Sequence, residues 1–513
     1  MSQTLIAALQ NPALYPHPVT AFNVIETHIS WVVLTGEYAY KIKKPVNFGF
    51  LDFTDLKARE HFCSEELRLN QRLTKGLYLD VVPITGRPES PQIGGEGPVI
   101  EYAIKMREFP QSQLLSEIEK RGELTEQHID ALAEQIARFH LSAPVVDASN
   151  ELGSPDAVMA PVRQNFEQIR PMLEHAQDLA QLDHLEAWAE EHFARLHPLF
   201  ERRKAEGFIR ECHGDIYLAN VTQLDGQVVL FDCIEFNEPF RMTDVIADTA
   251  FLAMDLEDRK HKTLARRFIN AYFEMTGDYD GLHVLPFYKA YRAMVRAKVN
   301  LFQYGQASDP AQKAEILARY RNYASLAESY CAIPYCLLAI THGVSAVGKS
   351  SAALKLVEAL GAIRIRSDVE RKRLIQDATP DVLYSAESGK ATYDRLHHLA
   401  ADILQAGYPV VLDATYLKQA QREAAAQVAE TAAVPFLIID CHAPDTVIAQ
   451  WLAERQAEGR DPSDATLAVV QAQQQGREAL TEQELIRTRH VDMTDPTNLD
   501  ALVKAMQDKL PVN

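Results

Sequence analysis

Residues 343–350 of this 513-residue chain read Gly343-Val344-Ser345-Ala346-Val347-Gly348-Lys349-Ser350. An apolar, strand-like segment precedes the run, and a helical pattern follows it from Ser351 to Leu360. Backbone N–H groups in such a glycine-bounded loop can close around phosphates, and the helix N-terminus adds positive potential. Lys349 can reach the β- and γ-phosphates of ATP, and the Ser350 hydroxyl can ligate Mg²⁺. We therefore expect a phosphate-binding loop that includes Ser351; the alternative is a glycine turn before an ordinary helix.

The segments around this loop alternate between strand-like and helical patterns. Short apolar strands are expected at 335–340, 409–412 and 435–439, and a helix at 392–405. Such alternation favours a parallel sheet with crossover helices. We expect an α/β P-loop NTPase domain with a parallel sheet over residues 331–513.

Two carboxylates follow predicted strands of this domain. Asp368 follows the strand-like 362–365, so it would lie at the carboxyl end of a strand, where ligands bind in open α/β sheets. There it could accept the proton of a substrate hydroxyl, and Arg371 could hold a substrate anion. Asp413 follows the apolar strand expected at 409–412, and at this position it could organise Mg²⁺ or a water bound to Mg²⁺. The alternatives are an Asp helix cap with solvated arginines for the first pair, and a strand-end turn for Asp413.

Two arginines suit a lid over the γ-phosphate. Arg455 and Arg460 flank a helix end before the loop sequence Asp461-Pro462-Ser463-Asp464. A solvated helical face is the alternative.

Residues 335–495 resemble the small P-loop kinases grouped with polynucleotide 5′-hydroxyl kinases, zeta toxins and chloramphenicol phosphotransferase. The resemblance implies ATP-dependent phosphorylation of a hydroxyl group. It also implies that Asp368 is the general base, that Arg371 is the substrate anchor, and that Arg455 and Arg460 belong to the lid.

The N-terminal part of the chain has a different pattern. Residues from about 20 to 110 alternate in the manner of strands, with a hairpin over 29–43 and one long helix over 54–73. From about 112 to 330 helical periodicity dominates, interrupted by a hairpin-like insert near 208–236. A small lobe with a sheet followed by a helical lobe predicts an α+β, protein-kinase-like bilobal domain over residues 1–330.

The stretch His213-Gly214-Asp215-Ile216-Tyr217-Leu218-Ala219-Asn220 carries an Asp and an Asn five residues apart, and Asp232 follows at the end of a strand. Phosphoryl transfer needs a carboxylate to orient the nucleophile and two further oxygen ligands for Mg²⁺. We assign Asp215 as the base and Asn220 and Asp232 as metal ligands; turn formation is the alternative.

This loop resembles the catalytic loop of the aminoglycoside phosphotransferase and choline kinase group, and the resemblance extends over about 20–325. It implies that Asp248, in Thr243–Asp248, braces the catalytic loop, and Phe287–Arg292 looks like the late helix of that group. Aminoglycosides are polycations, which an acidic cleft would suit, but the family name says little about the substrate.

An ATP-anchoring Lys is expected on the third strand, paired with a Glu on the following helix. Lys41 and Lys43 share one strand face, so alternation cannot choose between them; we favour Lys41 for its hydrophobic frame. On the helix, Glu66 falls inside an apolar arc and Glu60 at its edge, which favours Glu66. Two other polar residues, Arg59 and Asn70, also fall in the arc. No Gly-x-Gly-x-x-Gly precedes the strand, and Glu26–Ser30 occupies the corresponding turn.

The whole chain resembles two-domain bacterial proteins that fuse an aminoglycoside phosphotransferase-like domain to an AAA-type ATP-binding domain. The run Ala39–Phe53 is typical of that group. Their substrates are not implied by the resemblance.

The composition limits the partners. Hydrophobic residues make up 47% of the chain and charged residues 24%. The chain has 52 Lys and Arg and 71 Asp and Glu, which gives a net charge of −19. Such an acidic surface repels phosphate backbones and anionic lipid, which disfavours general nucleic-acid binding and membrane binding. Six cysteines without Cys-x-x-Cys spacing, no signal peptide and no long apolar run predict a cytoplasmic protein.

We therefore expect a bifunctional phosphotransferase that uses ATP and Mg²⁺ at two separate sites and acts on small-molecule hydroxyl substrates. One alternative is a nucleotide-switched regulator with a single working P-loop site and a pseudokinase-like N-terminal domain. Another is a P-loop kinase that serves nucleic-acid ends.

Overall fold

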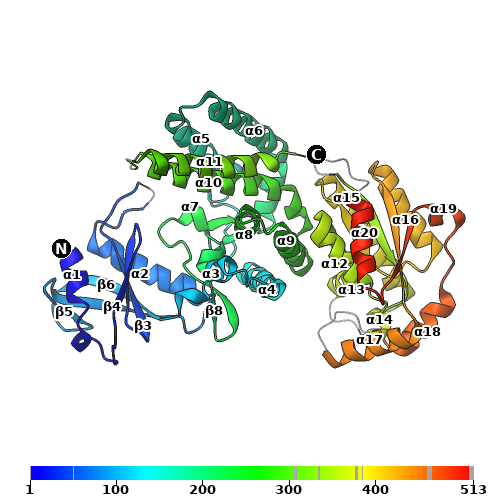
Figure 1. The fold of residues 1–513 in the computed structure, drawn as a ribbon, viewed down its shortest axis with the longest axis horizontal. Coiled ribbons are helices and arrows are strands. Elements are labelled where there is room, and N and C mark those ends of the chain that lie inside the picture. Colours follow the sequence, from blue (N-terminus) through cyan, green and yellow to red (C-terminus); the bar gives the residue numbers. More distant parts are fainter. Residues whose placement is uncertain are drawn as a thin grey trace. The chain divides into compact units, whose positions relative to one another are not determined.

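The computed structural model describes residues 2–49, 51–305, 307, 309–332, 335–375, 379–383, 385–458 and 465–507. The chain forms two compact units, labelled by element in Figure 1. The first unit comprises Met1–Asp255 and Tyr291–Arg321, and the second comprises Leu256–Ala290 and Asn322–Asn513. In the described part of the chain, no helix is long and apolar enough to cross a lipid bilayer.

A six-stranded antiparallel sheet begins the first unit, in the order β1-β2-β3-β6-β4-β5. The strands are β1 (Asn23–Glu26), β2 (Ser30–Leu34), β3 (Tyr38–Lys43), β4 (Tyr78–Arg87), β5 (Ser90–Ile93) and β6 (Val99–Arg107). The expected hairpin is β2–β3, and the expected long helix is α2 (Leu56–Gln71). The short helix α1 (Ser2–Ala8) precedes the sheet.

The two faces of this sheet have different partners. Tyr40 and Ile42 of β3 pack in a cluster with residues of α1, whereas Ala39 packs in a cluster with Cys63 of α2. Because side chains alternate along a strand, Lys41 and Lys43 lie on the same face as Ala39. Both lysines are therefore directed toward α2.

The rest of the first unit is mainly helical. Its longer helices are α3 (Leu115–Lys120), α4 (Glu126–Ser142), α5 (Pro155–Ile169), α6 (Ala176–Ala205), α8 (Val245–Asp258), α10 (Leu285–Tyr304) and α11 (Pro310–Ser329), of which the last three also have residues in the second unit. The expected insert is the hairpin of β8 (Val221–Leu224) and β9 (Gln227–Leu230), and β7 (Ile209–Glu211) pairs with β10 (Met242–Asp244). The short helix α7 (Glu238–Arg241) precedes β10. The expected kinase-like architecture, a sheet followed by helices, is confirmed.

A five-stranded parallel sheet forms the core of the second unit, in the order β12-β13-β11-β14-β15. The strands are β11 (Leu338–His342), β12 (Ile363–Arg366), β13 (Val410–Asp413), β14 (Phe436–His442) and β15 (Thr488–Asp492). The helices after β11 are α12 (Lys349–Leu360), α13 (Ser367–Leu374), α14 (Pro380–Leu383), α15 (Ala386–Gln405), α16 (Gln419–Thr431), α17 (Asp445–Glu458), α18 (Leu467–Gly476), α19 (Glu482–Ile486) and α20 (Thr497–Gln507). The expected α/β fold with a parallel sheet is confirmed.

The order of the strands places the phosphate-binding loop at the middle of the sheet. β11 lies between β13 and β14, and its carboxyl end leads directly into residues 343–348. α12 and α20 pack in the cluster that includes Ala339 and Val411, and α15 and α16 also contact the sheet. In open α/β sheets, ligands bind at the carboxyl ends of the strands where the strand order reverses, and β11 lies at that point here.

The second unit also includes α9 (Lys262–Thr276), although the sequence analysis assigns these residues to a domain that ends at residue 330. Arg266 donates from one guanidinium nitrogen to the carbonyl oxygens of Glu358 (3.1 Å) and Ala359 (2.7 Å), which satisfies the carboxyl end of α12. Asn270 accepts from the backbone N–H of Arg364 at 2.7 Å. The two compact units therefore do not divide at residues 330 and 331. The boundary between the two domains expected from the sequence stays a prediction.

Candidate phosphotransfer sites

Three distant segments meet at Lys41 in the first unit. Its ammonium donates to Glu66 Oε1 at 2.7 Å and to Asp232 Oδ1 at 2.5 Å. Burial acts to lower the pKa of Lys41, but the charges of Asp232 and Glu66 outweigh it and raise this pKa well above its ordinary value. Burial acts to raise the pKa of Asp232, and Lys41 outweighs that effect, so the pKa of this carboxyl is lowered. Both groups stay charged at neutral pH.

Lys43 has a different environment. Its side chain is only 1% exposed, lies over the Phe53 ring, and donates to Glu66 Oε2 at 2.6 Å and to Glu235 Oε1. Lys41 is the one of the two lysines that reaches Asp232. The geometry thus separates two residues that strand alternation could not, while the role of Lys41 with ATP stays a prediction.

The polar residues on the buried face of α2 have specific partners. Arg59 Nε donates to both carboxylate oxygens of Glu101, at 2.9 and 3.0 Å. Asn70 donates to the Glu66 carbonyl oxygen at 2.8 Å and accepts from the backbone N–H of Cys233 at 3.0 Å. Asn70 therefore attaches α2 to the residue after Asp232, a contact that the sequence analysis did not anticipate.

The predicted base and its neighbour are in contact. Asn220 Nδ2 donates to Asp215 Oδ2 at 3.0 Å, which leaves the amide oxygen of Asn220 to serve as a metal ligand. Burial raises the pKa of Asp215 to about 6, although Arg292 and Arg296 act in the opposite direction. A carboxylate with this pKa is mostly ionised at neutral pH and can accept a proton.

The backbone of the catalytic loop is held by His213 and Asp248. His213 Nδ1 accepts from the backbone N–H of Asp215 at 3.2 Å, and its Nε2 donates to the Phe231 carbonyl oxygen at 2.9 Å. Burial lowers the pKa of His213, so the ring is neutral. Asp248 accepts from the backbone N–H groups of His213 (2.8 Å) and Gly214 (2.9 Å). This geometry is that of a brace, the role the resemblance implies.

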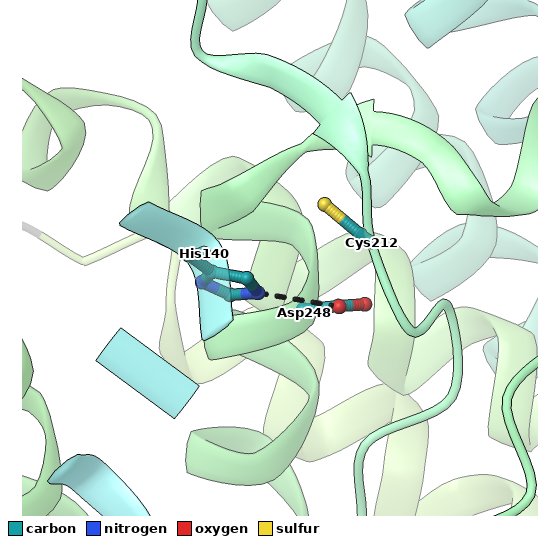
Figure 2. A group of neighbouring side chains, drawn as sticks. All are labelled: His140, Cys212 and Asp248. Atoms are coloured by element: carbon teal, nitrogen blue, oxygen red, sulfur yellow. Dashed lines mark hydrogen bonds and ion pairs between the residues drawn. The ribbon is translucent and has the colours of Figure 1, made fainter. Parts of the chain in front are cut away.

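Asp248 also belongs to a buried group with His140 and Cys212 (Figure 2). Their side-chain donor atoms lie within 4.8 Å of one another, and His140 Nε2 is 3.4 Å from Asp248 Oδ2. Burial raises the pKa of Cys212 well above its ordinary value, so the thiol stays protonated. Both carboxylate oxygens of Asp248 already accept backbone hydrogen bonds. A protonated thiol and a carboxylate whose oxygens are already hydrogen-bonded are poor metal ligands, so this group does not suit a metal ion.

The phosphate-binding loop of the second unit has the backbone its sequence requires. Gly343, Ala346 and Gly348 have φ values of +134°, +63° and +93°. A Cβ atom at Gly343 would lie 2.7 Å from the Cys441 carbonyl oxygen, so only glycine fits there. Lys349 donates to the Val344 carbonyl oxygen at 2.6 Å.

A carboxylate beside the loop has the character of a metal ligand. Asp413 ends β13, is 5% exposed, and its Oδ2 makes no hydrogen bond within the described part of the chain. Its nearest cation on that oxygen is Arg366 Nε at 3.7 Å. Burial lowers the pKa of Lys349, against the effect of Asp413 and then Asp368, so these charges lie near one another. An orphaned buried carboxylate oxygen fits Mg²⁺ or a water bound to it.

Asp368 and Arg371 lie one turn apart on α13. Arg371 Nη1 donates to Asp368 Oδ1 at 3.2 Å, and neither side chain is fully exposed. The alternative in which Asp368 caps the helix is wrong, because α13 begins at Ser367 with Arg366 at the capping position. Their roles as base and anchor stay predictions.

The predicted lid is described in part. Arg455 lies on α17 and donates to the Ala465 carbonyl oxygen at 3.4 Å. Its positive charge contributes to lowering the pKa of Lys349. Arg460 lies outside the described residues. Gln473 of α18 was not anticipated: its Oε1 accepts from the Ser345 N–H at 2.7 Å, and its Nε2 donates to Ser345 Oγ at 3.1 Å. A Gln-rich helix carries no sequence signal that would single out this residue.

Two families match the chain. The family described as "Phosphotransferase enzyme family" matches residues 105–285, and the one described as "AAA domain" matches residues 338–480. Among solved structures, the chain is similar to a choline/ethanolamine kinase family protein from Mesorhizobium loti (13% identity, 64% of this chain and 99% of that one, TM-score 0.39). It is also similar to a gluconokinase from Sinorhizobium meliloti (20% identity, 34% of this chain and 98% of that one, TM-score 0.26).

Relatives over nearly the full length come from mycobacteria. The uncharacterized proteins Rv2004c of Mycobacterium tuberculosis and Mb2027c of Mycobacterium bovis are each 32% identical over 475 residues. The aligned region is 89% of this chain and 92% of each relative. The chain, which joins a domain of the phosphotransferase enzyme family to an AAA domain, belongs to the family of these mycobacterial proteins.

Proposed function

We propose that the chain transfers the γ-phosphate of ATP to hydroxyl groups of small molecules at two separate sites, with Mg²⁺ as the metal. The observation that carries this proposal is the contact of Lys41 with Glu66 and Asp232 at once. It assembles a lysine for phosphates and a carboxylate for a metal from three segments far apart in the chain.

In the first unit, each proposed role follows from the contacts. Lys41 binds the phosphates of ATP, and Asn220 and Asp232 hold Mg²⁺, which neutralises charge on the transferring phosphate. Asp215 accepts the proton of the acceptor hydroxyl, and Asn220 orients its carboxylate. Asp248 keeps the loop backbone in place through two N–H groups.

In the second unit, the phosphate-binding loop takes the nucleotide. Lys349 turns from the Val344 carbonyl oxygen to the phosphates, and Ser350 and Asp413 hold Mg²⁺ directly or through water. Asp368 accepts the proton of the second acceptor, with Arg371 beside it as the anchor. The acceptor here is a small alcohol or the 5′-hydroxyl of a nucleic-acid end.

A second candidate is a regulator with one working nucleotide site, and the turn between β1 and β2 favours it. Thr27 and Ser30 bond to each other: the Thr27 N–H donates to the Ser30 carbonyl oxygen at 2.9 Å, and the Ser30 N–H donates to Thr27 Oγ1 at 2.9 Å. The Ile29 carbonyl oxygen also accepts from the Lys44 N–H at 2.7 Å. This closed turn has no glycine and offers few N–H groups to phosphates.

Calorimetry of ATP binding in the presence of Mg²⁺ separates the two candidates. The full chain and its Lys349→Ala variant are titrated with a nonhydrolysable ATP analogue. Two binding sites in the full chain and one in Lys349→Ala support two working nucleotide pockets. One site in the full chain and none in the variant means that the first unit does not hold ATP, and the regulator then replaces the bifunctional enzyme. Lys355→Ala, on the same helix and with its side chain 41% exposed in an ion pair with Asp500, is the matched control.

A further inference from the structure

A continuous series of contacts next to Asp215 joins two guanidinium groups and two aromatic rings. The rings of Tyr217 and Phe251 are 5.8 Å apart between centroids, with an interplanar angle of 22°. Arg296 Cζ lies 5.1 Å from the Tyr217 centroid, and Arg292 Cζ lies 4.9 Å from the Phe251 centroid. Cation–π contacts of this kind hold guanidinium groups in place.

The chain brings these groups to the predicted base. Tyr217 is two residues after Asp215, and both residues are partly exposed. Arg292 and Arg296 are four residues apart on α10, so they lie on one face of that helix. Their positive charges oppose the effect of burial on Asp215, as expected for groups close to its carboxyl.

Arg292 is an unusual buried cation. It is 6% exposed, and its Nε donates to the Ala247 carbonyl oxygen at 3.3 Å. Among the described residues, no carboxylate lies within ion-pair distance of it, whereas buried Arg is ordinarily paired. The guanidinium of Arg292, which stacks on the Phe251 ring, can present its N–H edge for bidentate contacts with a carboxylate or phosphate.

We infer that Arg292 and Arg296 form an anion-binding subsite beside Asp215, and that the N-terminal domain phosphorylates an alcohol bearing a phosphate or carboxylate group. This inference rests on the proposed phosphotransferase activity of that domain. A polycationic acceptor such as an aminoglycoside would meet two positive charges beside the base.

The anion takes no part in the bonds that change. The acceptor hydroxyl gives its proton to Asp215, and its oxygen forms a bond to the γ-phosphorus. The bond from that phosphorus to the β–γ bridging oxygen breaks, and ADP leaves. The contact of the acceptor anion with the guanidinium edges places the hydroxyl at Asp215.

The two guanidinium groups could instead bind the γ-phosphate of ATP, so the experiment distinguishes an anion of the acceptor from the γ-phosphate. The full chain carries Arg371→Gln, which removes the predicted anion anchor of the second unit, and all nucleotide sites are saturated with a nonhydrolysable ATP analogue and Mg²⁺. Inorganic phosphate and choline are then titrated by calorimetry. We expect phosphate to bind and choline not to bind at concentrations of about 10 mM.

The variants locate the bound phosphate. Arg296→Gln should weaken phosphate binding about tenfold while the affinity for the ATP analogue is unchanged. Arg292→Lys keeps the charge but loses the planar edge, so it tests the buried residue with less risk to folding. Arg138→Gln, on the exposed face of α4, is the control and should bind phosphate like the parent chain.

Three results would overturn the inference: no phosphate binding at about 10 mM, choline binding that Arg296→Gln strengthens, or a loss of analogue affinity in place of phosphate affinity. Transfer assays with ribose and ribose 5-phosphate keep the two proposals apart. Phosphate binding that depends on Arg296, without transfer to either sugar or any other alcohol, contradicts the proposed activity and supports the subsite. Transfer to neutral alcohols that Arg296→Gln leaves unchanged supports the activity and contradicts the subsite.

Discussion

Lys41 in the first unit and Lys349 in the second are the two lysines proposed to contact ATP phosphates, and they are held in opposite ways. Two carboxylates hold Lys41 and raise its pKa, whereas a backbone carbonyl oxygen holds Lys349, whose pKa burial lowers. The first site is assembled from charged side chains of distant segments, and the second from one contiguous loop. A site of the first kind depends on tertiary ion pairs, and a site of the second kind depends on local backbone geometry.

The largest effects should come from the two predicted bases, and they test whether the sites are independent. Asp215→Asn and Asp368→Asn should each lower one transfer activity about 10³-fold, because general base catalysis contributes 10²- to 10⁴-fold. The other activity and both ATP affinities should stay unchanged. Single-turnover transfer of labelled phosphate to the acceptor of each domain provides the measurement. Loss of both activities in either variant would show that the two sites are not independent.

The ion-pair network should make the first site sensitive to the loss of one carboxylate. Glu66→Ala leaves two buried lysines with one partner each, and breaking a buried pair costs about 3 kcal/mol or more. Urea unfolding of a full chain that keeps Trp31 as its one tryptophan (Trp188→Phe and Trp451→Phe), followed by fluorescence, should report this loss of stability. Glu60→Ala, at an exposed position of the same helix, is the control and should change stability by less than about 0.5 kcal/mol. Equal effects of the two variants would contradict the proposed difference between the sites.

The pH dependence should distinguish the first site. Burial raises the pKa of Asp215 to about 6, so the base becomes protonated as the pH falls through 6. The transfer rate of the N-terminal domain should then fall about tenfold per pH unit below that value. Arg296→Gln removes a charge that lowers this pKa, so the acid limb of the rate profile should move to higher pH. A limb near pH 4 in the parent chain would show that Asp215 is not the titrating base.

The smallest expected effect concerns the contact of Gln473 with the phosphate-binding loop. The Ser345 N–H now donates to this side chain, so a nucleotide that uses that donor must displace it. Gln473→Ala should tighten ATP binding at the second site by a few fold, the value of about one neutral hydrogen bond. Calorimetric titration measures the change, with Gln471→Ala, at an exposed position of α18, as the control. Weaker binding in Gln473→Ala would instead make Gln473 a ligand of the nucleotide.

Some elements were predictable because their signal is local. The hairpin β2–β3, helix α2 and the parallel strands after residue 337 follow from alternation and periodicity within short windows. β15 did not, because its sequence Thr-Arg-His-Val-Asp is polar for a strand in a parallel sheet. Its His490 lies 2.8 Å from Asp440, a partner 50 residues away that no local pattern reveals.

Other features depend on contacts between distant residues. Arg59 and Asn70 looked out of place in the apolar arc of α2, yet each has a buried partner, Glu101 and Cys233 respectively. The assignment of α9 to the second compact unit likewise depends on hydrogen bonds to α12 and β12. Periodicity reports which face of a helix is buried but not what covers it.

The sequence by itself determined the order of the two folds, the phosphate-binding loop and the Asp215, Asn220 and Asp232 spacing, because glycines, strand ends and helix starts act within a few residues. Only the tertiary structure decided that Lys41 rather than Lys43 faces Asp232, and that Arg296 of α10 packs on the ring of Tyr217, two residues from Asp215. Strand alternation places both lysines on the same face and does not distinguish between them. Their separation depends on Asp232 and Glu235, nearly 200 residues away, and such pairings exist only in the folded chain.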